Sequence, residues 1–166
     1  MASRDGKATL TTYTPEESYN TSLVLADSTS PLLACCFTTL SDYALFGAED
    51  GKWRLHQIIN NQTLATVEDP NASKGGISAL RIHPDGILLA TGSASGIVNL
   101  WDLRSNDKVG ALQTAGGVSS IAFSNKGINL VSTHTGTSSF ALWDVRKLAD
   151  TAIEPKDLIS FKNITQ

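Results

Sequence analysis

The 166-residue sequence has little that would point to a membrane, to nucleic acid or to secretion. No apolar run approaches the roughly 20 residues that a membrane-spanning helix needs. The first residues lack the basic start and apolar stretch of a secretory signal. The net charge is only -3, and the basic residues are scattered rather than gathered in a stripe that could follow phosphates. We therefore expect a globular protein of the cytosol or nucleus that binds neither membranes nor nucleic acid directly.

Cysteine is also scarce, because the chain has only Cys35 and Cys36. Neighbouring residues on a strand point to opposite faces, so a disulfide between these two would be strained. The repeat described below aligns Cys35 with Leu80 and Ile121, at a core position, and places Cys36 on the other face. Neither thiol has a neighbouring base that would lower its pKa. We predict two unreactive free thiols in a reducing compartment.

What the sequence does contain is an internal repeat. The strings NLWDLR and ALWDVR place Leu100 and Leu142 42 residues apart. Steps of 45 residues back from Leu100 reach Leu55 in DGKWRLHQ and then Leu10 in DGKATLTT. A period of this length indicates one small structural unit that is copied along the chain.

Each unit reads as four short strands separated by turns. In the clearest unit the strands are expected at 77–83, 87–93, 97–103 and 108–114, with a Pro-Asp-Gly turn after the first. A sheet that is apolar on both faces must stack on copies of itself. Four strands in about 42 residues, with a terminal Trp-Asp pair, are typical of a WD-repeat β-propeller blade. Helical 3.6-residue periodicity is absent, so the fold class is predicted to be all-β.

The repeat divides the chain into one partial blade, three blades and the start of another. The predicted boundaries are 1–30 for the partial blade, 31–74, 75–115 and 116–150 for the blades, and 151–166 for the first strand of the next. Propellers typically close with four to eight blades, so about three and a half blades predict an incomplete propeller. We therefore expect a fragment of a longer protein or a truncated gene product.

The tryptophans and aspartates of the repeat are predicted to be structural. In each Trp-Asp pair the indole packs against the blade, and the carboxylate accepts hydrogen bonds from turn backbone or hydroxyl groups. Structural roles are assigned to Asp50, Trp53, Trp101, Asp102, Trp143 and Asp144.

Sites of chemistry are not predicted, but sites of contact are. The histidines lack metal-ligand spacing, no serine lies in G-x-S-x-G, and TGSASG lacks the G-K-[ST] ending of a phosphate loop. We therefore expect no catalytic, metal-binding or cofactor-binding residues in this sequence. Turn residues Glu49, Ser95 and His134 fall on one rim of the predicted blades, and we predict them to contact a partner protein.

The strings RIHPDGILLATGSASGIVNLWDL and LWDVRKL resemble two successive blades of the pre-mRNA-processing factor 19 family. EDGKWRLHQI is more discriminating. That family has a blade with Trp early in its third strand and no Trp-Asp at its end, and here Trp53 is early while His56 and Gln57 stand in place of the pair. The resemblance covers the chain from about Asp42 to Thr151. A Gly-His that often precedes the first strand in the family is absent before the third blade.

The resemblance implies a non-catalytic recognition part of a ubiquitin ligase. The family is a core subunit of a spliceosome-associated complex, with a U-box for the conjugating enzyme, a coiled coil that forms tetramers, and a propeller that binds proteins. Neither the U-box nor the heptads occur in this sequence. Splicing, ubiquitination, DNA repair and a nuclear location follow from the resemblance alone. Two alternatives stay open: a WD-repeat scaffold of another pathway, and a propeller hydrolase, for which the sequence offers no cluster of carboxylates and histidines.

Overall fold

A computed structural model describes residues 3–14, 17–72, 74–136, 139–147 and 158–160. Apart from one 3-10 turn, η1 at Val145–Lys147, its regular elements are strands. No helix in these ranges is long and apolar enough to cross a membrane. The strands are β1 Lys7–Thr14, β2 Glu17–Asp27, β3 Leu32–Phe37, β4 Tyr43–Ala48, β5 Lys52–Gln57, β6 Gln62–Glu68, β7 Ile77–Ile82, β8 Leu88–Ser93, β9 Ile97–Asp102, β10 Asp107–Gln113, β11 Val118–Phe123, β12 Asn129–His134, β13 Ser139–Asp144 and β14 Leu158–Ser160.

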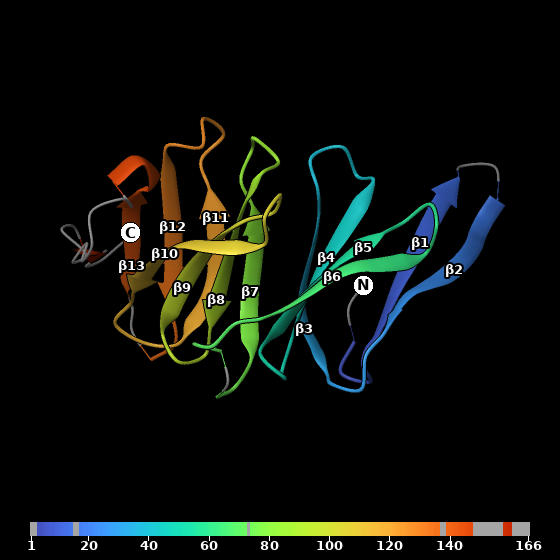
Figure 1. Cartoon of the computed structure of the whole chain (residues 1–166), viewed down its shortest axis with the longest axis horizontal. Coiled ribbons are helices and arrows are strands. Elements are labelled where there is room, and N and C mark those ends of the chain that lie inside the picture. Colours follow the sequence, from blue (N-terminus) through green and yellow to red (C-terminus); the bar gives the residue numbers. More distant parts are fainter. Residues whose placement is uncertain (1–2, 15–16, 73, 137–138, 148–157, 161–166) are drawn as a thin grey trace, which may run out of the picture.

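The strands form three four-stranded antiparallel sheets and one two-stranded sheet. Strands that follow one another in the chain pair with each other, in the orders β3-β4-β5-β6, β7-β8-β9-β10 and β11-β12-β13-β14. Figure 1 shows these sheets side by side along the long axis, with β1 and β2 at one end. Strand β7 contacts both β3 and β11, so the first strands of successive sheets lie next to one another. The prediction of an all-β, incomplete propeller is confirmed; we call the three four-stranded sheets the first, second and third blade.

The pair β1-β2 corresponds to the third and fourth strands of a blade. Strand β1 begins after a turn in which the Lys7 N–H donates to the Asp5 carboxylate at 3.1 Å. Strand β5 begins in the same way, since the Lys52 N–H donates to Asp50 at 3.0 Å. In both turns the glycine that follows the aspartate has a positive φ, which glycine adopts without strain.

The end of the chain differs from the sequence prediction. Residues 151–166 were expected to begin a further blade. Instead β14 pairs antiparallel with β13, with Phe140 opposite Ile159, and so supplies the fourth strand of the third blade. This pairing covers the outer edge of β13 from Ser139 to Ala141, where the backbone groups would otherwise stay open. The rest of this segment lies outside the described residues.

Apolar side chains fill the spaces between the sheets, as both faces of each blade require. Between the first and second blades the core includes two tryptophan rings, Trp53 and Trp101, whose centroids lie 5.8 Å apart at an angle of 65°. The buried cluster there is Leu45, Trp53, Ala72, Ile77, Leu80, Leu89 and Trp101. Between the second and third blades it is Ala79, Ala90, Val98, Leu100, Leu112, Val118, Ile121, Leu130, Ala141 and Trp143. A smaller cluster joins β1 to the first blade: Ala8, Leu32, Ala44, Phe46 and Ala48.

Two glycines 45 residues apart set how closely the blades approach. A Cβ at Gly47 would lie 2.6 Å from Cγ2 of Ile77, and one at Gly92 would lie 2.5 Å from Cγ1 of Val118. Both distances are well inside van der Waals contact. The bare backbone of the second strand therefore makes room for the first strand of the next blade.

The substitution Gly92→Ala tests this close approach. We expect it to lower the free energy of unfolding by about 1–3 kcal/mol, because the added methyl group overpacks the space against Val118. The measurement is the midpoint of urea denaturation. Combining it with Val118→Ala should cost less than the sum of the two single changes, since the second change removes Cγ1 of Val118, the atom nearest to the added methyl group. Strictly additive costs would show that the two residues do not compete for the same space.

Candidate functional site

The predicted contact residues were Glu49, Ser95 and His134, in the turns that follow the second strand of each blade. We call this edge the second-turn rim; its described turns are 49–51, 94–96 and 135–136. Glu49 and Ser95 are exposed there. The Ser95 hydroxyl donates to the Asn71 carbonyl at 2.6 Å and lies 2.7 Å from the Ser93 hydroxyl, which fixes its position. Both side chains can therefore meet a partner.

His134 is not on the surface of that rim. His134 is only 5% exposed, and Nε2 of its ring lies 3.0 Å from the Ser132 hydroxyl inside the blade. Ser132 in turn accepts a hydrogen bond from Nε1 of Trp143 at 3.0 Å. The predicted partner contact by His134 is therefore corrected: the ring faces inward because it ends a buried relay from the tryptophan. Nδ1 is buried without a partner in the described part of the chain, and burial lowers the pKa of this histidine.

The second blade has the same relay with a carboxylate at its end. Nε1 of Trp101 donates to the Thr91 hydroxyl at 2.9 Å, and that hydroxyl donates to Asp69 at 2.9 Å. Asp69 is buried and also accepts from the Asn99 amide at 2.6 Å and from the Asn71 N–H at 2.9 Å. These donors satisfy a carboxylate that would otherwise be costly to bury. Sequence reasoning missed Asp69, although its place before a Pro-Asn turn is a usable signal.

The aspartates of the two Trp-Asp pairs lie at the opposite edge of the blades. Asp102 accepts from the Arg104 N–H at 2.8 Å and from the Arg104 guanidinium at 2.6 and 3.1 Å. Asp144 and Arg146 repeat this arrangement, with 2.6 and 2.9 Å to the guanidinium. The arginine hydrogen bonds lower the pKa of each carboxyl group to about 2. The sequence predicts that these carboxylates accept hydrogen bonds from turn backbone N–H groups, but it does not predict the arginine side chains as partners.

A family model, "WD domain, G-beta repeat", matches residues 61–102. Pre-mRNA-processing factor 19 of Oryza sativa subsp. japonica is 29% identical over 86% of this chain and 27% of its own length. Pre-mRNA-processing factor 19 homolog 2 of Arabidopsis thaliana is 29% identical over 78% of this chain and 24% of its own. The protein of that name from Mus musculus is 33% identical over 49% of this chain and 16% of its own.

The chain is similar over most of its length to proteins named pre-mRNA-processing factor 19, and residues 61–102 match the WD-repeat model. It spans about a quarter of the length of the first two relatives. The resemblance proposed from EDGKWRLHQI, HPDG and LWDVRKL thus agrees with matches that extend beyond those strings.

The irregular blade that carried this family resemblance is the first. Trp53 is fully buried and faces the second blade, and its Nε1 has no hydrogen-bond partner among the described residues. His56 takes the position that Trp101 has in the next blade. Its ring nitrogens lie 3.2 Å from the Thr63 hydroxyl and 2.9 Å from the Asn61 amide oxygen. The His56 ring is therefore hydrogen-bonded to the third turn and to the fourth strand of the first blade. In the other two blades the tryptophan is hydrogen-bonded to the second strand instead. In the same blade the Arg54 guanidinium donates to the Asp50 carboxylate at 2.6 Å.

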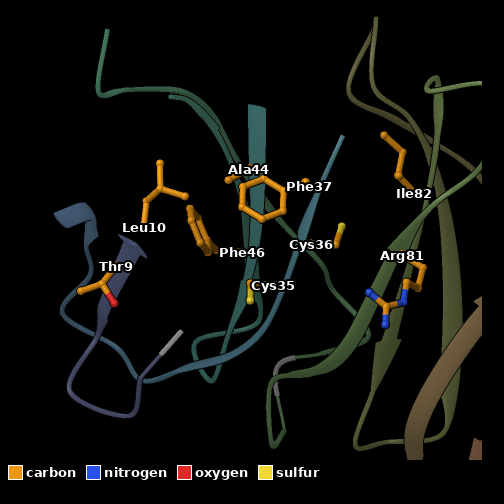
Figure 2. Close-up of a pocket in the computed structure, with 9 residues that line it drawn as sticks. All are labelled: Thr9, Leu10, Cys35, Cys36, Phe37, Ala44, Phe46, Arg81 and Ile82. Atoms are coloured by element: carbon orange, nitrogen blue, oxygen red, sulfur yellow. The ribbon is translucent and has the colours of Figure 1, made fainter. Parts of the chain in front are cut away.

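An apolar hollow of about 400 Å³ lies between β1, β3, β4 and β7 (Figure 2). Leu10 and Phe46 line one side of it, and Cys36 and Ile82 line the other.

The prediction that Cys35 lies at a core position is wrong, because its side chain is exposed. Leu80 and Ile121, which occupy the same position in the next two blades, are each covered by a complete preceding blade. In the described part of the chain only β1 and β2 precede Cys35. Burial raises the pKa of Cys36 to about 11, so this thiol is protonated at neutral pH.

No group of three histidine, cysteine, aspartate or glutamate side chains is placed to hold a metal ion in the ranges that the structure describes. What the geometry offers is a rigid frame with exposed turn residues, which suits protein recognition.

His134 gives the blades a pH dependence that can be measured. Its pKa is lowered in the folded state, so the unfolded chain takes up the proton first as the pH falls. The stability that it contributes is present above its ordinary pKa of about 6.5 and declines below that value. We expect the free energy of unfolding to fall between about pH 7 and pH 5, and His134→Ser, which places the residue of the second blade there, to flatten this decline. An unchanged decline in the variant would contradict the assignment.

Asp69 is expected to be a large contributor to stability. Asp69→Ala would leave the Thr91 hydroxyl and one N–H of the Asn99 amide buried without an acceptor, so we expect the free energy of unfolding to fall by about 3 kcal/mol in chemical denaturation. Asp107→Ala, at an exposed aspartate of β10, is the matched control and should change stability by less than about 0.5 kcal/mol. Equal effects of the two substitutions would show that the buried carboxylate is not needed.

Proposed function

We propose that the chain is a non-catalytic, protein-binding WD-repeat scaffold that acts in pre-mRNA processing in the nucleus. The observation that carries this proposal is the match to several proteins named pre-mRNA-processing factor 19, over up to 86% of the chain. The all-β blades support a scaffold, because their cores are buried on both faces while the turns stay exposed. The partners are then proteins of the splicing machinery.

The finer proposal is that the chain is the recognition part of a ubiquitin ligase subunit of the spliceosome-associated complex. It is supported by the family resemblance of the first blade, with Trp53 early in β5 and His56 in place of the usual tryptophan. Ligase activity through a U-box, tetramer formation through a coiled coil, and a role in DNA repair would be properties of the whole protein. Partners would come from the splicing and ubiquitination machinery, without direct contact to nucleic acid or membrane.

Glu49 and Ser95 are the proposed contacts on the second-turn rim. Both belong to short turns that are anchored by backbone hydrogen bonds, such as the Glu49 N–H to the Pro31 carbonyl at 2.9 Å. A turn held in this way presents its side chain with little loss of conformational entropy on binding. His134 is left out of this surface because it is buried.

The test is affinity capture from nuclear extract with the tagged 166-residue chain, followed by mass spectrometry. We expect enrichment of splicing-complex subunits, and reduced recovery with the double variant Glu49→Lys and Ser95→Lys. Glu68→Lys, at an exposed position of β6, is the control for a change of charge. Failure to enrich any splicing subunit would overturn the proposal. Consistent recovery of a different complex would instead favour a WD-repeat scaffold of another pathway.

A further inference from the structure

The opposite edge of the first blade carries an unusual set of exposed apolar side chains. We call it the first-turn rim; it holds the turns after the first and third strands, which for this blade are 38–42 and 58–61. Leu40 is 82% exposed and Ile59 is 85% exposed, more than any other large apolar side chain in the described part. Phe37, at the end of β3, is 49% exposed. Single exposed apolar residues are ordinary, whereas several on one edge mark an interaction site.

The rim is hollowed on both sides of Tyr43. One hollow, of about 400 Å³, lies between the turn that carries Leu40 and the Asp85-Gly86 turn of the second blade. The other, of about 380 Å³, is bounded by Ile58 and Ile59. Asp42 and Tyr43 line both. We call these adjoining hollows the rim groove; it extends from the turns of the first blade to the Asp85-Gly86 turn of the second.

The charge of the rim groove is negative. Asp42 is exposed, and its carboxylate makes no hydrogen bond or ion pair with the described residues. Asp85 adds a second carboxylate, which accepts from the Ile87 N–H and approaches His83 at 3.0 Å. Arg104 is paired with Asp102 at 2.6 Å and also attracts Asp85, so Asp42 is the carboxylate of the groove that has no basic partner among the described residues. An acidic groove repels phosphate chains and attracts basic side chains.

We propose that the rim groove binds an extended segment of a partner protein in which a lysine or arginine lies between large apolar residues. The apolar side chains occupy the two hollows, against Leu40 and Ile59, and the basic group pairs with Asp42 between them. Burying an apolar side chain supplies most of the affinity, and the unpaired carboxylate selects the charge. This inference rests on the proposed function as a protein-binding scaffold, and it assigns a second contact surface on the rim opposite Glu49 and Ser95.

A second copy of this chain fits the rim groove less well. The chain has a net charge of -3, so an acidic groove would face a second molecule that is also negatively charged overall. Charge complementarity therefore favours a basic partner segment over self-association.

The test is fluorescence anisotropy with the whole chain and a labelled synthetic peptide in which leucine alternates with arginine. A matched peptide with glutamate in place of arginine is the control for charge. We expect the arginine peptide to bind and the glutamate peptide to bind at least about tenfold more weakly. Leu40→Ser with Ile59→Ser should weaken binding of the arginine peptide about tenfold or more, and Asp42→Asn about threefold. Leu64→Ser with Val109→Ser, at exposed apolar positions outside the rim groove, should leave it unchanged.

Three results would overturn the inference. One is no binding of the arginine peptide, and another is binding that the Leu40 and Ile59 changes do not weaken. The third is a dimer in sedimentation that dissociates in the same double variant, which would make a second copy the occupant. None of these bears on the capture of splicing subunits by the second-turn rim, so the inference and the proposed function can fail separately.

Discussion

The structure depends on the approach of the first strand of each blade to the second strand of the blade before it. At Gly47 and Gly92 the backbone has no side chain, and the branched residues Ile77 and Val118 fill the space. A sheet with two apolar faces is stable only if both are covered in this way. The burial of Trp53 and Trp101 follows from this stacking, because these two rings pack against each other across the boundary between the first and second blades. The relay from Trp143 through Ser132 to His134 lies within a single blade and braces it from inside.

Much of this could be predicted from the sequence because it is periodic. The period of 42 to 45 residues, the strand lengths and the all-β class are properties of local pattern, and turn residues such as Asp50 and Gly51 mark where strands begin. The predictions that failed depend on what lies next to a residue. Cys35 occupies a core position of the repeat but has an incomplete neighbour, and Leu158–Ser160 could be assigned only once the open edge of β13 was known.

The candidate site was harder to predict for a related reason. His134 falls in a turn region by sequence, yet its ring takes the position in the third blade that Asp69 has in the second. A polar residue in a turn points outward or inward according to whether a buried donor needs it, and sequence spacing does not contain that information. The same holds for Leu40 and Ile59, which look like ordinary apolar turn residues until the adjoining hollows and Asp42 are seen together. The two rims therefore differ in character, one polar and one apolar with acidic groups.

The family match over residues 61–102 begins one residue before β6 of the first blade and ends with β9 of the second, so its bounds do not coincide with those of a single sheet. Yet Asp69, Thr91, Asn99 and Trp101 all lie within it. The matched unit thus carries the hydrogen-bond relay of the second blade together with the closing strand of the first. A repeat defined in this way completes the sheet of the preceding blade and supplies three strands of its own, so successive units are joined by backbone pairing as well as by side-chain packing.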